Sequence, residues 1–380
     1  MQLSPRIRSV AFATGVGLAC ARVCSAQETP DDQTLATLLR WFGDSNHVSV
    51  RSAVGDYSVP MANGTGLMLH WNNEKVTVPG ITGAPGSQEA IDAITTASHP
   101  ISGNPYADFV KVRNEMQAEV SKGGAAVSYY HSSEVDYLAQ QVAARYARDL
   151  RGQQLNLSVG TSYGWDHIDP VENVNNPVAP ATKNTLHANA VATEVLSPAS
   201  VLRVGVEVDH VEGLQHNPYR RVYAGGTSVP ENQPTSRLRR DAFVKFNQYL
   251  ANRSSLKFSY RFYDDDWGVM SHETGAQLSQ YLTSGLNVQY RYRWYTQTAA
   301  DFYRAEYLTT NGVDGYLTGD YRLGPLSSHL FDVTLQMDLG VLAASSRVFR
   351  HLGVTLDYGR YFNSNNYSAD ILETGVDFRF

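Results

Sequence analysis

The last ten residues of the chain read Ile371-Leu372-Glu373-Thr374-Gly375-Val376-Asp377-Phe378-Arg379-Phe380. Successive side chains of a β-strand point to opposite faces, so this stretch has one apolar face and one charged face. The apolar face carries Leu372, Thr374, Val376, Phe378 and Phe380, and the polar face carries Glu373, Gly375, Asp377 and Arg379. A two-faced strand that ends on an aromatic residue is typical of the closing strand of a bacterial outer-membrane β-barrel, with lipid outside and water inside.

The two terminal phenylalanines of this strand have a predicted role in assembly. Phe378 and Phe380 lie on the lipid-facing side, with Phe380 at the periplasmic rim. We therefore expect them to be the assembly signal by which the barrel-assembly machinery engages the C-terminal strand.

The amino terminus indicates export. Arg6 and Arg8 form a short positive region, the run from Val10 to Ala19 is mostly apolar, and Cys24-Ser25-Ala26 supplies small residues. This pattern predicts a signal peptide over residues 1–26 that is cleaved after Ala26. The apolar run is too short for a spanning helix, which needs about 20 residues. Lipoprotein processing at Cys20 is the alternative, but the residue three positions before it is Gly17 rather than a large aliphatic residue.

Cysteine usage and charge exclude several classes of protein. Both cysteines, Cys20 and Cys24, lie in the signal, so the mature chain would have no disulfide, thiolate metal site or catalytic thiol. Removing Arg6, Arg8 and Arg22 from the 31 basic residues leaves 28 against 37 acidic residues, a net charge of −9. That balance argues against nucleic-acid binding. Because no later segment is apolar for 18 residues, a membrane-spanning form must be a barrel, since only helices and closed barrels satisfy the backbone in lipid.

The same two-residue period recurs along the chain. Besides the last strand, it is clear at 155–166, 202–209, 256–262, 286–294, 331–339 and 352–358. Weaker runs lie at 47–58, 65–78, 109–121, 124–133, 136–149, 183–196, 239–250, 273–284 and 315–323. The total predicts an all-β fold, a single antiparallel transmembrane β-barrel of about 16 strands, with 14 as the alternative because bacterial barrels have even strand numbers. The alternation of up and down strands fails near 309–348, so one strand there is open to revision. A secreted β-sandwich would also alternate, but it seldom places charges on one face of so many strands.

The links between strands suggest the orientation. Short links at 151–152, 251–253 and 324–326 are expected to be periplasmic turns, and long Pro-, Gly-, Asn- and Ser-rich links at 79–106, 168–182 and 212–237 to be extracellular loops. The barrel is expected to cover 47–380. In the preceding segment, 27–46, Leu35, Leu38, Leu39 and Phe42 have helical spacing, which predicts a short periplasmic or plugging helix; a tail packed on the barrel rim is the alternative.

Several short strings resemble a family of Gram-negative outer-membrane proteins catalogued as domain of unknown function 3570. They are His47-Val48-Ser49-Val50-Arg51, Val78-Pro79-Gly80-Ile81, Ile91-Asp92-Ala93-Ile94-Thr95-Thr96-Ala97-Ser98, Tyr129-Tyr130-His131-Ser132-Ser133-Glu134-Val135-Asp136-Tyr137, Arg291-Tyr292-Arg293-Trp294-Tyr295 and Asp320-Tyr321-Arg322-Leu323. The resemblance implies an outer-membrane barrel of unsettled activity. It also hints at a periplasmic or extracellular partner from an envelope electron-transfer, protein-modification or secretion system.

Charged residues on the polar faces of the strands form the main candidate site. The predicted lumen-facing set is Lys111, Arg113, Glu115, Glu119, Arg203, Glu207, Asp209, Lys245, Lys257, Arg261, Arg291, Arg293, Asp332, Asp338, Asp357, Glu373, Asp377 and Arg379. In a pore, such charges would set the selectivity for solutes. In a closed interior, they would form a salt-bridged network, and the mixed signs favour that reading slightly.

Two further clusters are weaker candidates. Asp264, Asp265 and Asp266 supply the oxygen ligands that Ca²⁺ prefers, but neighbours in a strand diverge, so a solvated acidic loop is the simpler interpretation. The stretch His131-Ser132-Ser133-Glu134-Val135-Asp136 combines a base, hydroxyls and carboxylates near a hairpin tip, as a hydrolase on the barrel rim would need. Adjacent residues seldom assemble that geometry, so a polar hairpin is favoured.

Neither the aromatic residues nor any cofactor motif indicates a further functional site. Tyr295, Phe302, Tyr303 and Tyr307 could line a path for sugars, but aromatic girdles explain them more simply. The sequence has no Walker loop and no GxGxxG motif, and its histidines lack metal-ligand spacing, so neither a cofactor nor a metal is expected.

Three classes of function remain. A channel for small solutes is preferred because about sixteen strands can leave an aqueous lumen. A scaffold barrel for an envelope partner is the alternative, and a rim hydrolase is the least favoured.

Overall fold

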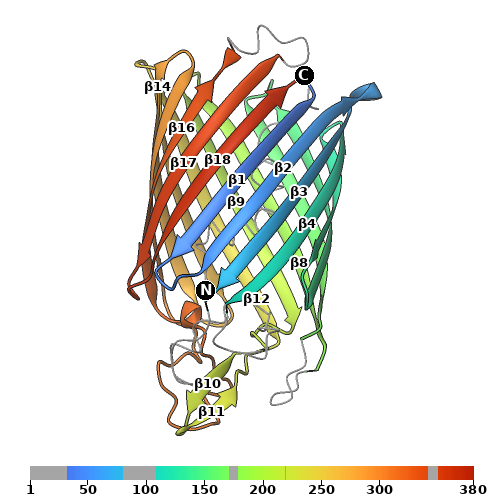
Figure 1. Ribbon diagram of the computed structural model, residues 1–380. Helices are drawn as coiled ribbons and strands as arrows, with labels where there is room; N and C mark the ends of the chain where they lie inside the picture. The colour runs from blue at the N-terminus through green and yellow to red at the C-terminus, as the bar shows by residue number, and fades with distance from the viewer. Residues whose placement is uncertain (1–31, 80–107, 171–178, 219, 341–349) are drawn as a thin grey trace.

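A computed structural model describes residues 32–79, 108–170, 179–218, 220–340 and 350–380. Within these ranges, sixteen strands close into one antiparallel barrel, in which β1 pairs with both β2 and β18 (Figure 1). The short strands β10 and β11 form a separate hairpin beyond one end of the barrel. The prediction of a single sixteen-stranded all-β barrel is confirmed.

The strands have the following bounds. The first half of the wall consists of β1 (Thr34–Asp44), β2 (Ser49–Met61), β3 (Thr65–Val78), β4 (Phe109–Lys122), β5 (Ala125–Ser133), β6 (Tyr137–Leu150), β7 (Leu155–Ile168) and β8 (Ala181–Ser197). The rest consists of β9 (Ser200–Gly213), β12 (Ser236–Leu250), β13 (Ser254–Asp265), β14 (Met270–Thr283), β15 (Leu286–Gln297), β16 (Leu326–Asp338), β17 (His351–Asn363) and β18 (Ser368–Arg379). The separate hairpin is β10 (Arg221–Ala224) and β11 (Thr227–Pro230), and two short 3₁₀ turns are η1 (Ala62–Gly64) and η2 (Tyr321–Leu323).

The strand that closes the barrel is one for which the sequence predicted a helix. Residues 34–44 of the 27–46 segment form β1 rather than a helix, a plug or a rim tail, so the barrel begins at residue 34 instead of 47. Leu39 and Trp41 are exposed on the outside, whereas Phe42 is buried inside against an apolar cluster. Because the inner face of β1 carries Leu38 and Phe42 beside Arg40, apolar residues stand on both faces. This masks the two-residue alternation, and the helical spacing of the leucines is coincidental.

A second difference lies between β15 and β16. Residues 315–323 form no strand, and the predicted periplasmic turn at 324–326 belongs to the long link that precedes β16. The side chains of Leu317 and Leu323 are buried in contacts outside the barrel wall, which explains their strand-like pattern. One strand was therefore predicted in excess and one was missed, so the total of sixteen still holds. The signal peptide and the string Ile91–Ser98 lie outside the described residues.

The two ends of the barrel differ in their connections. Thr34 and Arg379 are register partners, so the first and last strands begin and end at the same rim, where Gly123-Gly124, Ala251–Arg253 and Ser284-Gly285 make short links. Gly123 and Gly124 have φ of 58° and 84°, as a tight hairpin turn requires. The long links 79–108, 214–235 and 298–325 are at the other end. Since short turns mark the periplasmic side of such barrels, the long links are extracellular.

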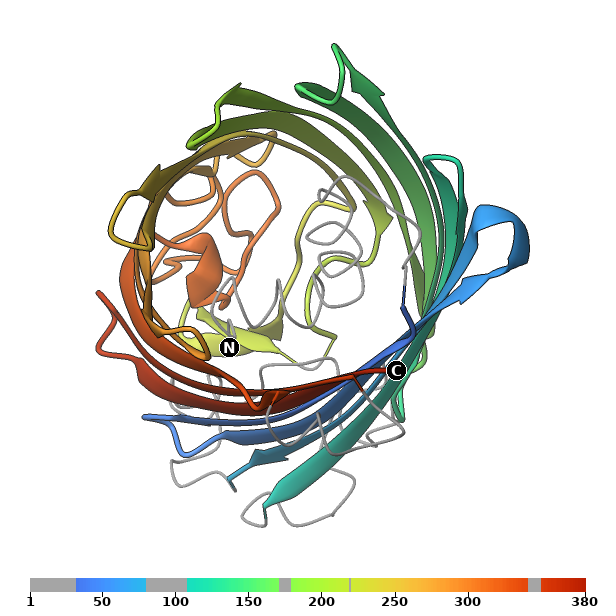
Figure 2. The ribbon, with the colours of Figure 1, turned by 90° about the horizontal axis from the view of Figure 1, so that it is seen from above.

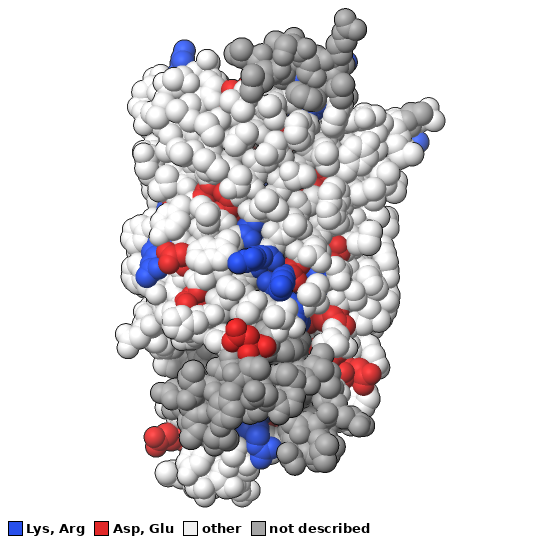
Figure 3. Space-filling view, viewed as in Figure 1, with Lys and Arg blue, Asp and Glu red and all other residues white. Residues whose placement is uncertain are grey.

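The wall has an apolar outer face. Exposed large residues alternate with buried ones on most strands; they include Leu69, Trp71, Met116, Val204, Val206, Phe258, Tyr290, Phe331 and Leu372. Figure 3 shows that the half of this face nearer the C-terminus carries few charged residues, and that charged residues gather toward the extracellular end. The outer face therefore suits lipid.

The inner face is polar over most of the ring and apolar in one sector. Phe42, Val50, Val76, Leu330, Tyr361 and Ile371 pack together on the inner side of β1–β3 and β16–β18, near the extracellular end. Seen end-on, the strands enclose a broad, flattened ring (Figure 2). Among the described residues, no helix is long and apolar enough to cross a membrane.

Candidate functional site: the charged inner wall and its extracellular cap

Every charged residue of the predicted lumen-facing set lies on the strand face opposite to the lipid-facing side chains. On β4, Lys111, Glu115 and Glu119 are buried while Val112 and Met116 are exposed outside. On β15, Arg293 is buried while Tyr290, Tyr292 and Trp294 are exposed. The inner wall gathers these charges into three sectors, each with its own pairing.

The first sector covers β3 to β6 and is densely ion-paired. Arg113 lies 3.0 Å from both Glu74 and Glu115, whose side chains are 8% and 0% exposed. The amide of Asn72 donates to Glu115 at 2.9 Å, and the Tyr130 hydroxyl donates to it at 3.0 Å. These groups form a buried ion-paired cluster, and removing any one member would leave a buried charge without its partner.

Two further pairs flank that cluster. Lys111 pairs with Glu134 at the β5–β6 hairpin, and Arg145 lies 2.5 Å from Glu119 toward the periplasmic end. Glu134 belongs to the string His131–Asp136 that was considered for a rim hydrolase. Its carboxylate is engaged with Lys111, so the hairpin joins the ion-paired wall rather than orienting a base.

The second sector covers β9, β12 and β13, half a ring away from β1–β3 in the sixteen-strand order. Three cations surround the ring of Phe243, at centroid distances of 5.6 Å for Arg203, 5.2 Å for Lys245 and 5.4 Å for Arg261. Arg203 and Lys245 are register partners, so like charges stand directly opposite on the inner face. Lys257 lies on the same face of β13 and is exposed. This sector is the most cationic part of the inner wall.

Carboxylates balance part of this charge. Arg261 lies 3.4 Å from Glu207 and 3.1 Å from Asp241. The carboxylate of Asp209 lies 2.6 Å from Nδ1 of His187, and Arg293 pairs with Glu273 at 3.1 Å.

The third sector covers β15 to β18 and β1. Arg291 lies 3.4 Å from Asp332, the Thr334 hydroxyl donates to Asp357 at 2.5 Å, and Arg40 pairs with Glu373 at 2.5 Å across the seam between β1 and β18. At the periplasmic rim, His351 bridges Asp338 and Asp377 at 3.5 and 3.3 Å, and Arg379 lies beside them as the register partner of His351. Arg40 also faces the lumen, but it was not among the predicted lumen residues because the segment that holds it was predicted to be helical.

The three consecutive aspartates at the end of β13 diverge. Asp264 points outward and lies 2.5 Å from Arg240, whereas Asp265 points inward to Arg237 and accepts the Tyr263 hydroxyl at 2.6 Å. Asp266 accepts the backbone N–H of Leu238 at 3.0 Å. Within the described ranges, no group of three His, Cys, Asp or Glu side chains is arranged to hold a metal ion.

A folded cap, which was not predicted from the sequence, lies at the extracellular mouth of the barrel. The cap consists of residues 220–235, with the β10–β11 hairpin, and residues 298–325 (Figures 1 and 2). The two segments join through backbone hydrogen bonds between Asn232 and Leu317 at 3.0 and 2.9 Å, and through a parallel bridge from Ala224 to Tyr307. The side-chain amide of Gln297 ties the cap to β15 by donating to the Arg322 and Gly324 carbonyls at 2.7 Å.

Two small apolar cores support the cap. Trp267, Val269, Ala300, Phe302 and Leu323 form one, and Val222, Ala224, Tyr307 and Leu317 form the other. The interpretation of Phe302, Tyr303 and Tyr307 as lipid-facing girdle aromatics is wrong, since Phe302 and Tyr307 are buried inside the cap and Tyr303 packs against the first core. The Tyr307 hydroxyl donates to the Phe302 carbonyl at 2.8 Å, and burial raises its pKa.

A buried ion cluster links the two segments of the cap. Arg220 lies 3.0 Å from Asp320 and 3.5 Å from Glu231, and Asp320 also pairs with Arg322. The backbone N–H of Gly319 donates to Glu231 at 3.0 Å. Burial alone would raise the pKa of the Asp320 carboxyl, but Arg220 and Arg322 hold that pKa well below its usual range. The cluster thus stays charged and locks the cap.

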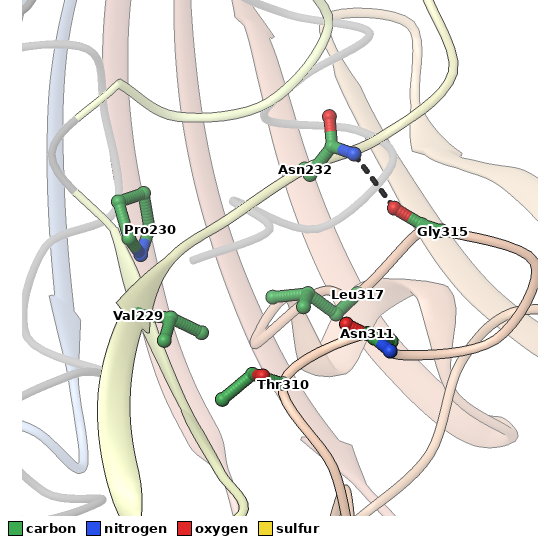
Figure 4. A pocket seen from close by; sticks show the side chains of 7 residues that line it. All are labelled: Val229, Pro230, Asn232, Thr310, Asn311, Gly315 and Leu317. Atoms are coloured by element: carbon green, nitrogen blue, oxygen red, sulfur yellow. Dashed lines mark hydrogen bonds between the residues drawn. The ribbon is translucent and has the colours of Figure 1, made fainter.

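A shallow pocket of about 350 Å³ opens between the two segments. Figure 4 shows its lining, which combines Val229, Pro230 and Leu317 with Asn232, Thr310, Asn311 and Gly315. Asn232 is turned toward the rim, where its amide donates to the Gly315 carbonyl at 2.7 Å. The pocket carries no charged group, so it differs in chemistry from the inner wall.

The closed barrel, its apolar outer face and its polar inner face define the class: the protein is a β-barrel of the bacterial outer membrane. The family described as Protein of unknown function (DUF3570) matches residues 176–351, which confirms the resemblance over β8 to β16 and the cap. A search of curated proteins found no match.

Solved outer-membrane barrels match the chain at low identity and with TM-scores below 0.5. OccD3 (OpdP) of Pseudomonas aeruginosa is 11% identical, with a TM-score of 0.46 and 94% of each chain covered. OpdK of P. aeruginosa, solved with vanillate, is 10% identical with a TM-score of 0.40, covering 93% of this chain and 100% of that one. The siderophore receptor PirA of P. aeruginosa is 12% identical with a TM-score of 0.42, and the match spans 88% of this chain but only 57% of the receptor.

Proposed function

We propose that the protein is an outer-membrane channel for small polar solutes. The observation that supports it best is the inner wall of the sixteen-strand ring, which carries charged side chains in all three sectors. A barrel of sixteen or more strands is wide enough to leave an aqueous path, whereas eight strands are filled by their own side chains. Polar inner faces of that size serve water-filled channels.

The distribution of charge supports a preference among solutes. The cations around Phe243 stand half a ring away from β2 and β3, where the carboxylates of Asp56 and Glu74 contact His70 and Arg113. The excess of cations around Phe243 would attract anionic solutes toward that side of the lumen. The cap would then restrict entry by size, since it is an ordered structure at the extracellular mouth.

Solute flux into proteoliposomes tests the proposal. The purified barrel is reconstituted, and swelling is followed after addition of a small sugar, a zwitterionic amino acid or a small carboxylate in isosmotic solution. We expect entry of each small solute and exclusion of an oligosaccharide too large for the lumen. Liposomes with the heat-unfolded protein supply the control. Flux no faster than in that control, with correctly inserted and heat-modifiable barrel, would refute a channel.

A further inference from the structure

Two cations face outward in register on the extracellular part of the barrel wall. Arg51 on β2 and Lys75 on β3 are direct cross-strand partners, and both are exposed. Like charges placed directly opposite each other on a sheet are destabilising. Their juxtaposition on the lipid-facing side is therefore costly unless an anion lies between them.

Other outward cations near the same end have a carboxylate within the wall. Arg240 lies 2.5 Å from Asp264, and Arg360 lies 2.5 Å from Asp370. In the part of the chain that the structure describes, neither Arg51 nor Lys75 forms an ion pair. Figure 3 shows a basic patch on this face where β1 to β4 approach the extracellular end. Arg240 and Arg360 thus pair with carboxylates of the wall itself, whereas the adjacent cations Arg51 and Lys75 are accessible to an external anion.

Tryptophans place this pair at the level of lipid headgroups. Trp41 is the register partner of Arg51 on the other side, and its indole is 42% exposed. Trp71 lies two repeats of the strand pleat further into the apolar belt from Lys75, and its ring covers Gly55, where a Cβ would lie 1.8 Å from the indole. Tryptophans concentrate at the membrane–water interface. Arg51 and Lys75 therefore lie where the belt gives way to the polar surface.

We propose that Arg51 and Lys75 bind a phosphate group of an outer-leaflet glycolipid. The fork of the arginine suits two phosphate oxygens, and the lysine adds a point charge beside it. The exposed apolar side chains of Leu39, Leu69 and Met116 on the neighbouring strands lie toward the membrane interior, where acyl chains of the same lipid would pack. A phosphorylated lipid would pair with both cations and also cover the apolar belt with its acyl chains, whereas a free anion would only pair with the cations.

The test measures stabilisation by a defined lipid. The full-length barrel in detergent is titrated with bisphosphorylated lipid A, with its dephosphorylated form, and with inorganic phosphate, while the unfolding temperature is recorded. A ligand that binds only the folded state raises that temperature. We expect lipid A to stabilise the wild type, and R51Q/K75Q to bind it about a hundredfold more weakly, at roughly tenfold for each lost charge-assisted hydrogen bond.

Matched variants make the outcome decisive. Arg148→Gln removes an exposed cation from the outer face at the periplasmic end and is expected to leave lipid A binding unchanged. Lys75→Arg keeps the charge and should retain binding. Without lipid, R51Q/K75Q should unfold at the wild-type temperature or above, since it removes a repulsion. Equal stabilisation of wild type and R51Q/K75Q by lipid A would overturn the proposal. So would equal stabilisation of the wild type by the dephosphorylated lipid, or by inorganic phosphate alone.

Discussion

The ion cluster of the cap shows what a few buried side chains can do to a loop. Arg220 and Glu231 come from one segment and Asp320 from another, and each is less than 10% exposed. A cluster of this kind contributes little net stability compared with apolar packing, yet losing one member is expensive because its partners remain buried and charged. The cap is therefore held in one arrangement by charged groups, and removing any one of them should destabilise it.

Asp320→Asn tests that arrangement. The change leaves Arg322 without its carboxylate and weakens the link to Arg220, so we expect the cap to lose about 3–5 kcal/mol of stability against local opening. Hydrogen exchange of the amides of residues 220–231 measures this loss. Asp314→Asn, in an exposed turn of the same cap, is the control and should leave exchange unchanged. Equal protection in both variants would show that the cluster does not hold the cap.

The pH dependence of the cap should follow His216. Burial lowers the pKa of this imidazole; Glu231 opposes that shift and Arg220 adds to it. Because the folded-state pKa lies below the ordinary value, the unfolded segment binds the proton more readily. The stabilisation is therefore present above about pH 6.5 and is lost as the pH falls through the lower folded pKa. Proteolysis of the cap should become faster between pH 7 and pH 5 in the wild type, and His216→Asn should flatten that dependence. A wild-type rate that does not change over this range would contradict the assignment.

At the scale of elements, the seam between β1 and β18 explains where sequence reasoning succeeds and fails. In β18 an apolar face alternates with a charged one, so Leu372 and Glu373 identify both the strand and its orientation. In β1 the inner face carries Phe42 within an apolar cluster, so the alternation vanishes although the strand has equal importance for closure. The period of a strand is visible in sequence only where its two faces meet different environments.

The end of β18 supplies a prediction about assembly. The Phe380 N–H donates to the Gln33 carbonyl at 3.0 Å, and its ring stacks on Phe378 with centroids 6.5 Å apart. Asp377, on the inner face, contacts only His351 among the ion pairs at that rim. Deleting Phe380 should therefore reduce surface levels of folded barrel far more than Asp377→Asn does. Heat-modifiable mobility of outer-membrane fractions measures both, and equal levels would refute this division of roles.

At the scale of the whole molecule, the sequence predicted the barrel, its strand number and the inner charges, but not how those charges meet. Lys111 lies in β4 and Glu134 in the β5–β6 link, and the register of the strands brings them together, which no local pattern specifies. The cap could not be predicted from the sequence for a similar reason. Its segments are separated by four strands of sequence, and residues such as Leu317 and Thr318 gain their roles through contacts with the distant segment that holds Asn232 and Gln233.

The cationic sector yields a prediction about selectivity. Arg203, beside Phe243, and Lys257, on the inner face of β13, both face the lumen, so replacing both by glutamine removes two positive charges from one wall without removing any carboxylate. The reversal potential in a salt gradient should shift toward cation preference. Arg148→Gln, on the outer face, should leave that potential at the wild-type value. An unchanged potential in R203Q/K257Q would place the sector away from the permeation path.

Single-channel recording in planar bilayers tests the central claim most directly. The account predicts that the wild-type barrel inserts and produces ohmic current steps of one reproducible size. The steps should persist at low voltage, and their ion preference should respond to R203Q/K257Q. A bilayer that stays silent while the inserted protein is shown to be folded and heat-modifiable would contradict the channel.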